Sequence, residues 1–305
     1  MPRIVGHSSN ASIILITIVL TMALATEVHA AMDTAKIEQI TGLKGTFSKE
    51  ENVFKLSRPR TDVMVRADNW QIPPFMGLTS WIAFTPAHDA QVMAMGDLVL
   101  FEDEVNPVMS VALDAGLEVT ALHNHFFFEQ PKVYFMHIGG MGNIDDLAGG
   151  VKKVFDKVNT IRKAKPTPAN EFAGVHIGRV NRITAAPLEA VFGTKGQSSN
   201  GMFKIVFGRS ATMHGVSVGK EMGVNTWAGF AGSDNQAVVD GDFAVLESEL
   251  QSVLKSMRAG GINIVAIHQH MNSAQPHYLF LHYWGKGKAG DLAKVIHRTL
   301  ALQEK

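Results

Sequence analysis

The sequence contains no cysteine among its 305 residues. Disulfide bonds, thiolate metal sites and cysteine nucleophiles are therefore excluded, and so is the cysteine that carries the lipid of a bacterial lipoprotein. The Gly-x-Ser-x-Gly, His-Glu-x-x-His and P-loop motifs are also missing. Any metal site in this chain must be built from nitrogen, oxygen or thioether ligands.

An excess of charge of one sign is missing as well. The 28 Lys and Arg residues balance 28 Asp and Glu residues, so the formal net charge is zero. A nucleic-acid binder needs surplus basic residues to neutralise phosphates, and this class of partner is excluded on that ground. No Lys/Arg block indicates a membrane-surface patch either. A small molecule or a cell-envelope ligand is the partner class that remains.

A membrane-spanning run is lacking too. The apolar stretch at residues 12–25, "SIILITIVLTMALA", is shorter than the roughly 20 residues that a spanning helix needs. Arg3 gives a positive charge ahead of it, and Val28-His29-Ala30 places small residues where a signal peptidase cuts. Residues 1–30 are therefore predicted to be a signal peptide, and the mature protein to be periplasmic, without stable membrane insertion. An uncleaved anchor is the alternative.

The chain carries an internal duplication. Residues 96–148 align with residues 241–293 without a gap at an offset of 145, and about a third of the aligned positions are identical. The period is far longer than a solenoid repeat, which favours two similar domains packed together. We place the first repeat domain at 31–160 and the second at 183–305. A linker rich in Lys, Pro and Ala covers 161–182.

Each repeat has the same expected order of elements: a short helix, a run of strands, a helix, two strands and a last amphipathic helix. This predicts an α+β fold with an antiparallel sheet and helices in each domain. The strand–helix–strand–strand–helix order is compatible with split βαβ (ferredoxin-like) units. The middle helices are expected at 104–115 and 249–259, with Asp103 and Ser248 as their N-caps.

Histidines recur at the same place in both repeats. His123 and His125 stand two apart in one β-rich segment, and His268 and His270 repeat the spacing. Side chains alternate along a strand, so each pair points to one face with about 6.6 Å between its members. Two imidazoles so placed can bind one metal ion, with Zn²⁺ the first choice for such ligands and Cu²⁺ the next.

Other groups could complete these sites. His137 and His282 follow each pair, but a hairpin that turns near Phe128 would put His137 about 13 Å from His123. His137 and His282 are therefore candidates for separate ligands or acid–base groups. Glu102 and Glu247, placed ahead of the expected helices, are the carboxylate candidates for further ligands or catalysis.

A different interpretation of the histidines stays open. Buried imidazoles bonded to backbone carbonyls would be purely structural, and the protein would then be a non-catalytic module that binds an envelope glycan or small ligand. The histidines persist between the repeats while neighbours such as Asn124 and Gln269 differ, which favours a divalent-metal site. If a coordination position is open to water, metal-dependent hydrolysis is the natural chemistry. Whether the protein is an enzyme is not decided by these residues.

Three stretches also indicate a family. The segment "NPVMSVALDAGLEVTALHNHFFFEQPKVYFMHIGGMG", the Thr-Trp-x-x-Phe element and "RPRTD" at 58–62 resemble the LppY/LpqO family, as does the full duplication. That bacterial family is named from mycobacterial lipoproteins, and its domain has no known function. The resemblance implies export and a duplicated domain, and it supplies no catalytic residues. The lipoprotein cysteine is absent here, so membrane tethering does not carry over.

Overall fold

A computed structural model describes residues 1–2 and 32–303. The predicted signal peptide lies almost wholly outside the described residues. Within the described part, no helix combines the length and apolar character needed to cross a membrane. The mixture of helices with antiparallel strands confirms the α+β prediction.

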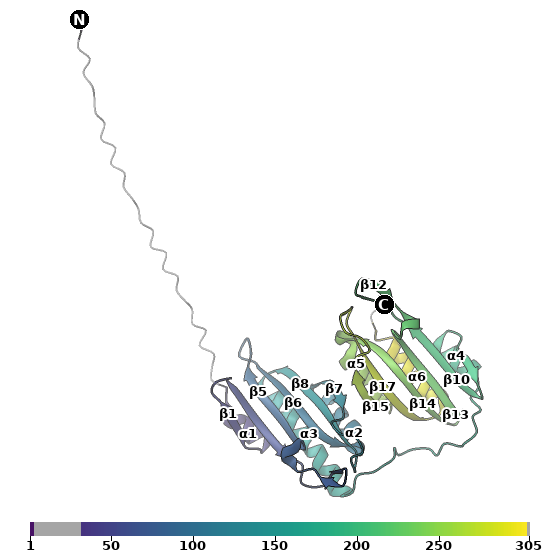
Figure 1. The fold of residues 1–305 in the computed structure, drawn as a ribbon, viewed down its shortest axis with the longest axis horizontal. Coiled ribbons are helices and arrows are strands. Elements are labelled where there is room, and N and C mark those ends of the chain that lie inside the picture. The colour runs from purple at the N-terminus through teal and green to yellow at the C-terminus, as the bar shows by residue number, and fades with distance from the viewer. Residues whose placement is uncertain (3–31, 304–305) are drawn as a thin grey trace. The chain divides into compact units, whose positions relative to one another are not determined.

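The first repeat follows the expected order of elements (Figure 1). Its helices and main strands are α1 (Thr34–Thr41), β1 (Gly45–Ser48), β2 (Val53–Pro59), β5 (Thr79–Pro86), β6 (Val92–Phe101), α2 (Glu102–Asp114), β7 (Glu118–His123), β8 (Val133–Gly142) and α3 (Ile144–Ala164). The excursion between β2 and β5 contains β3 (Arg66–Ala67), β4 (Trp70–Gln71) and the 3-10 helix η1 (Pro74–Met76).

The second repeat has the same plan. Its helices and main strands are α4 (Ala185–Phe192), β9 (Gln197–Ser199), β10 (Met202–Gly208), β13 (Asn225–Ser233), β14 (Gln236–Leu246), α5 (Glu247–Ala259), β15 (Asn263–His268), β17 (Tyr278–Gly287) and α6 (Ala289–Leu300). Three short strands and a 3-10 helix complete it: β11 (Ala211–Met213), β12 (Val216–Val218), β16 (Ala274–Gln275) and η2 (Lys220–Met222).

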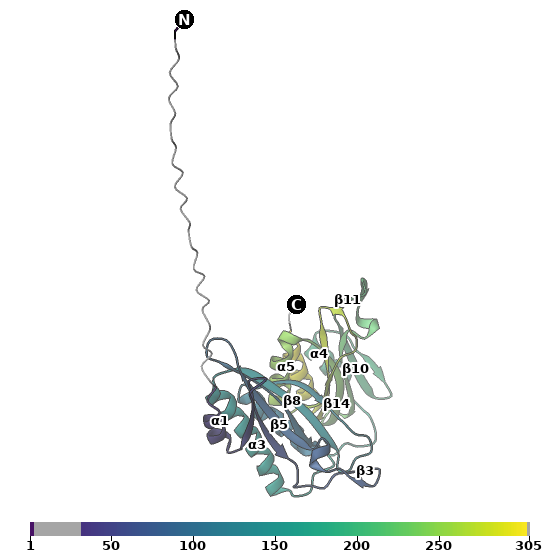
Figure 2. The ribbon, with the colours of Figure 1, turned by 60° about the vertical axis from the view of Figure 1, so that its left-hand side comes forward.

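The main strands form one sheet in the order β1-β2-β5-β6-β8-β7-β15-β17-β14-β13-β10-β9. The order reads the same in each repeat when counted outward from the β7–β15 junction. In each repeat the helices pack on one face of these strands (Figures 1 and 2), where the main apolar core lies. The segments that follow β2 and β10 cover part of the opposite face, and the rest of that face is exposed to solvent. The ferredoxin-like layout and the domain boundaries stay predictions.

The junction between the repeats is reciprocal. Leu122 of β7 pairs with Ile267 of β15, its equivalent at the offset of 145. The Asn106 amide exchanges two hydrogen bonds with the backbone of Ile264, at 3.0 and 2.7 Å. Gln251, the equivalent of Asn106, makes the same two bonds with Val119, both at 2.9 Å. A pseudo-twofold axis therefore relates the repeats, as in a symmetric dimer interface.

Helix α2 begins earlier than expected. Phe101 is its N-cap, and the Glu104 side chain accepts a hydrogen bond from the Phe101 backbone N–H at 2.9 Å. Asp103 lies inside the helix, so its prediction as the N-cap is wrong, because the carboxylate of the third helical residue already satisfies the free amide. The second repeat repeats this arrangement through Leu246, Glu247, Ser248 and Glu249.

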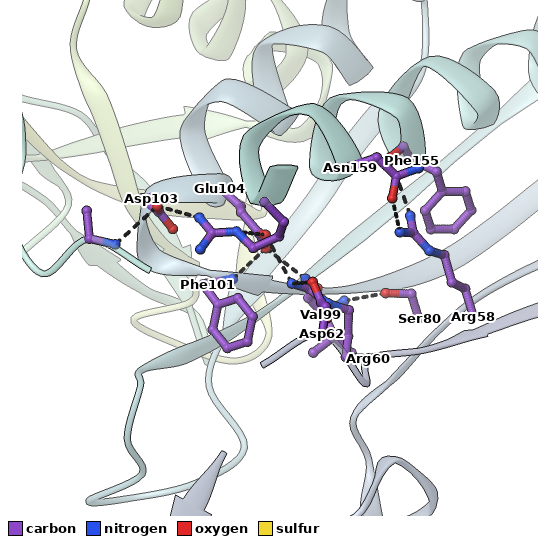
Figure 3. A network of polar contacts seen from close by, with 12 residues as sticks. Arg58, Arg60, Asp62, Ser80, Val99, Phe101, Asp103, Glu104, Phe155 and Asn159 are labelled. Atoms are coloured by element: carbon purple, nitrogen blue, oxygen red, sulfur yellow. Dashed lines mark hydrogen bonds and ion pairs between the residues drawn. The ribbon is translucent and has the colours of Figure 1, made fainter. Parts of the chain in front are cut away.

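Glu104 also anchors a buried ionic network (Figure 3). The Arg60 guanidinium donates to both of its carboxylate oxygens, at 2.7 and 3.0 Å, and to an oxygen pair on Asp62. Arg162 Nε lies 2.7 Å from Glu104, and the Arg162 guanidinium also contacts Asp103. Arg60 and Glu104 are 3% and 0% exposed. The network fastens the end of β2 and helix α3 to the start of α2, which is a structural role.

Candidate metal site

Three strands bring the first histidine cluster together. Asp97 of β6 is the register partner of His137 of β8, which is in turn opposite Ala121 of β7. His123 follows Ala121 by two residues and so lies on the same face of the sheet, one step from His137. A β-bulge between Val119 and Ala121 sets this register.

The structure corrects the expected position of His137. His123 is paired with Phe135, two residues further along β8 than the Val133 pairing that a turn near Phe128 implies. The His123 and His137 rings therefore stack with centroids 5.1 Å apart, in place of the predicted 13 Å or so. An error of two residues in the register keeps a side chain on the same face of the sheet but moves it along the strand. The sequence of the loop at 124–132 does not indicate which register the two strands adopt.

The imidazoles of the first repeat converge at one edge. His123 Nε2 lies 3.2 Å from His125 Nε2. Two nitrogens bound to one tetrahedral zinc ion at about 2.05 Å would be about 3.3 Å apart. Below the pair, Phe135 stacks against His125 with ring centroids 3.5 Å apart. The apolar floor fixes the orientation of the His125 ring, which lies outside the strand.

The second repeat builds the same cluster. Asp242 is the register partner of His282, and the His268 and His282 rings stack at 4.7 Å. His270 Nε2 lies 3.1 Å from the Asp242 carboxylate, and its ring stacks on Phe280 at 3.5 Å. Ligand atoms of Asp242, His268 and His270 all lie within 4.8 Å of one another, a spacing suited to a single metal ion.

The two carboxylates are the residues that sequence reasoning missed. Asp97 and Asp242 are 9% and 4% exposed. They are an identical pair in the repeat alignment, and each is a charged residue within a largely apolar strand. That combination was the signal that could have identified them, since a buried carboxylate is rare unless it is paired or binds a metal.

Several polar atoms of the clusters are buried without a partner. Within the described chain, Asp97 Oδ1, Asp242 Oδ1 and His268 Nε2 accept or donate no hydrogen bond. By contrast, His270 Nδ1 lies 3.2 Å from the Gly223 carbonyl and His282 Nδ1 lies 3.3 Å from the Gly241 carbonyl. Those contacts hold the rings through Nδ1, as backbone contacts do around metal-ligating histidines, so Nε2 is the nitrogen left to bind a metal in each ring. In His270 that nitrogen already faces the Asp242 carboxylate.

Burial shifts the pKa values at both sites. It raises the pKa of the Asp97 and Asp242 carboxyls, although the three histidines around each carboxylate act in the opposite direction. Burial also lowers the pKa of the His123 and His268 imidazoles. The neutral imidazole is the form that binds a metal, so these two side chains stay available as ligands below the ordinary histidine pKa.

The structure does not bring Glu102 and Glu247 to the imidazoles. Each follows its aspartate, Asp97 or Asp242, by five residues, about 16 Å along an extended chain. Each is exposed at the first position of its helix. Burial and the nearby Glu129 raise the pKa of the Glu102 carboxyl, which Lys132 acts to lower. Among the described residues, the carboxylates that face the histidines are the two aspartates.

Comparisons with known proteins supply a family and no activity. A family model described as "Domain of Unknown Function (DUF1259)" matches residues 35–157 and again residues 186–302, which supports the duplication. No curated protein matches the chain.

Two solved structures of shell proteins are similar at low identity. The double ringed trimeric shell protein MSM0271 from the RMM microcompartment is 11% identical, with 71% of this chain and 83% of that chain covered and a TM-score of 0.19. The trimeric bacterial microcompartment shell protein PduB is 10% identical, with 85% and 89% covered and a TM-score of 0.19.

Proposed function

We propose that this chain, which belongs to the family described as Domain of Unknown Function (DUF1259), binds one divalent metal ion in each of its two repeats. Each site would consist of three imidazoles and one aspartate. The ligands are His123, His125, His137 and Asp97 in the first repeat, and His268, His270, His282 and Asp242 in the second.

The observation that carries the proposal is the set of buried polar atoms without partners. A purely structural histidine or aspartate would have its buried atoms hydrogen-bonded, because an unsatisfied buried acceptor costs about 1–3 kcal/mol. Asp97 Oδ1 and Asp242 Oδ1 both carry this cost at equivalent positions. A cation bound between the carboxylate and the imidazoles would remove it in both repeats.

The ligand chemistry favours zinc. Imidazole nitrogen and carboxylate oxygen suit Zn²⁺ in a tetrahedral arrangement, and Cu²⁺ is the next choice. Four protein ligands would make a closed site. Hydrolysis requires an open position for water, which arises if the aspartate accepts a proton from that water in place of binding the metal. His125 and His270 are exposed, so solvent or a substrate can reach that side.

The alternative is a non-catalytic module that binds an envelope glycan or small ligand. Trp81 and Trp227 are register partners of Asp97 and Asp242 and lie on the same face of the sheet, where aromatic rings could stack on a sugar. Each ring instead has a lysine over it: Lys55 Nζ at 4.5 Å and Lys204 Nζ at 4.1 Å from the ring centroids. We therefore rank metal binding first.

We also propose a cellular location for the protein, a narrower family and a fold type for each repeat. The composition of residues 1–30 supports export to the periplasm. The quoted motifs support placement with the LppY/LpqO proteins within the wider family. The enclosure of β8 between β6 and β7 supports a split βαβ unit in each repeat.

Metal content of the protein purified without an affinity tag tests the proposal. Mass spectrometry should find close to one zinc or copper ion per repeat. The His123→Ala/His125→Ala variant and the His268→Ala/His270→Ala variant should each lose one of the two ions. A His88→Ala/His214→Ala variant removes one exposed histidine per repeat outside the clusters and should lose none. Absence of metal even after incubation with Zn²⁺ or Cu²⁺ would refute the proposal.

A further inference from the structure

Three methionines lie together on the open face of the first repeat. Met93 of β6 and Met141 of β8 are direct register partners, and Met95 follows Met93 by two residues on the same face. Their side chains are 39%, 58% and 54% exposed. The neighbouring Met136 of β8 points the other way and is fully buried. The three exposed thioethers are therefore a distinct group.

Their spacing allows the sulfur atoms to meet. Cross-strand partners such as Met93 and Met141 have Cβ atoms about 4.5–5.5 Å apart. Met95 is about 6.6 Å along the strand from Met93. The residue opposite Met95 is Gly139, which has no side chain and leaves room for Met95 and Met141 to lean together. With three rotatable bonds each, the side chains can bring their sulfurs to a common point.

We propose that Met93, Met95 and Met141 form a binding site for a soft monovalent cation, Cu⁺ in particular. Thioether sulfur is a soft ligand that selects Cu⁺ over Zn²⁺ and other hard or borderline ions. This site is separate from the imidazole cluster and does not depend on the function proposed for it.

The second repeat lacks the site, which gives an internal comparison. The positions equivalent to the three methionines carry Val238, Asp240 and Lys286. A lysine ammonium disfavours a cation beside it, and no thioether remains. The two repeats therefore share the imidazole cluster and differ in the methionine group, so soft-metal binding should belong to the first repeat alone.

The test follows the methionine methyl groups directly. The protein without residues 1–30, labelled with ¹³C at its methionine methyl groups, is titrated with Ag⁺ and observed by NMR. Ag⁺ is a redox-inert analogue of Cu⁺. Three methyl resonances should shift and saturate with the first equivalent. Single Met→Leu variants should assign them to Met93, Met95 and Met141. Shifts spread over many methionines without saturation would overturn the proposal.

Affinity provides the second measurement. The Met93→Leu/Met95→Leu/Met141→Leu variant keeps the apolar surface but removes the thioethers. Its Cu⁺ affinity, measured anaerobically against a competing chelator, should fall at least about tenfold. The matched Met202→Leu/Met222→Leu variant changes two exposed methionines elsewhere and should bind like the wild type. The proposal fails if the triple variant binds Cu⁺ as tightly as the wild type. It also fails if His123→Ala/His125→Ala abolishes Cu⁺ binding.

Discussion

Asp97→Asn should make the metal-free protein more stable while weakening its affinity for metal. The wild-type carboxylate is 9% exposed, and its Oδ1 atom has no hydrogen-bond partner within the described chain. An unsatisfied buried acceptor costs about 1–3 kcal/mol, and more when it is charged. Asparagine has the same shape and still buries a polar group, but it removes the charge, whose burial costs more than that of a neutral group, so the free energy of unfolding should rise by about 1–3 kcal/mol at pH 7.

The stability difference between Asp97→Asn and the wild type should depend on pH in a known direction. Burial raises the pKa of the Asp97 carboxyl above its unfolded value near 3.8. The ionised folded form is therefore penalised above the folded pKa, and the penalty disappears as pH falls through the folded pKa toward the unfolded one. The stability advantage of Asp97→Asn over the wild type should be greatest above the folded pKa and should shrink as the pH falls toward the unfolded value near 3.8.

Urea denaturation of chelator-treated protein at several pH values measures this advantage. Asp242→Asn is the matched variant, and its gain should be smaller because Asp242 Oδ2 already lies 3.1 Å from His270 Nε2. With Zn²⁺ present, both variants should lose their advantage, because the wild-type carboxylate then has a ligand. A metal-free Asp97→Asn protein less stable than the wild type would show that the carboxylate is a structural group and would refute the reasoning.

Other substitutions test the scaffold by urea denaturation. Glu104→Ala removes the buried carboxylate that pairs with Arg60 and Arg162 and should cost about 3–5 kcal/mol. Glu249→Ala should cost less, because the arginine it pairs with is 14% exposed; equal costs would contradict this. Gly96→Ala places a methyl group 2.6 Å from a backbone oxygen of the next strand and should cost about 1–3 kcal/mol. Gly149→Ala, within α3 and with nothing near its added methyl group, should stabilise by about 0.5–1 kcal/mol.

The sequence predicts the local elements well and the joining of the repeats poorly. Alternating apolar residues and the internal repeat identify the strands, the helices and their common order in both copies. They do not indicate that β7 and β15 pair, because only Leu122 and Ile267 are register partners across the junction. Pairing between segments so distant in the chain depends on side-chain amides such as Asn106, which looks like an ordinary helix residue.

The histidine site shows a similar division. His123 and His125 lie near each other, with ring centroids 5.1 Å apart, but His125 lies beyond the end of β7, so strand alternation alone does not position it. The position of His137 depends on hairpin register, which the loop and the bulge set and which local pattern does not specify. Glu102 is the carboxylate that the sequence favours, because it precedes the expected helix, whereas Asp97 faces the histidines only through the register of β6 and β8.

The carboxylate carries the strongest argument that the clusters are sites. Folding alone gives no reason to retain an ionised group whose burial costs stability, when a neutral side chain of similar shape would avoid that cost. The chain retains it in both repeats, opposite His137 and His282, while about two thirds of the aligned positions differ. A buried carboxylate that lowers stability at equivalent positions of both repeats is expected where that carboxylate binds a ligand. The aspartates are therefore the residues whose replacement best separates function from stability.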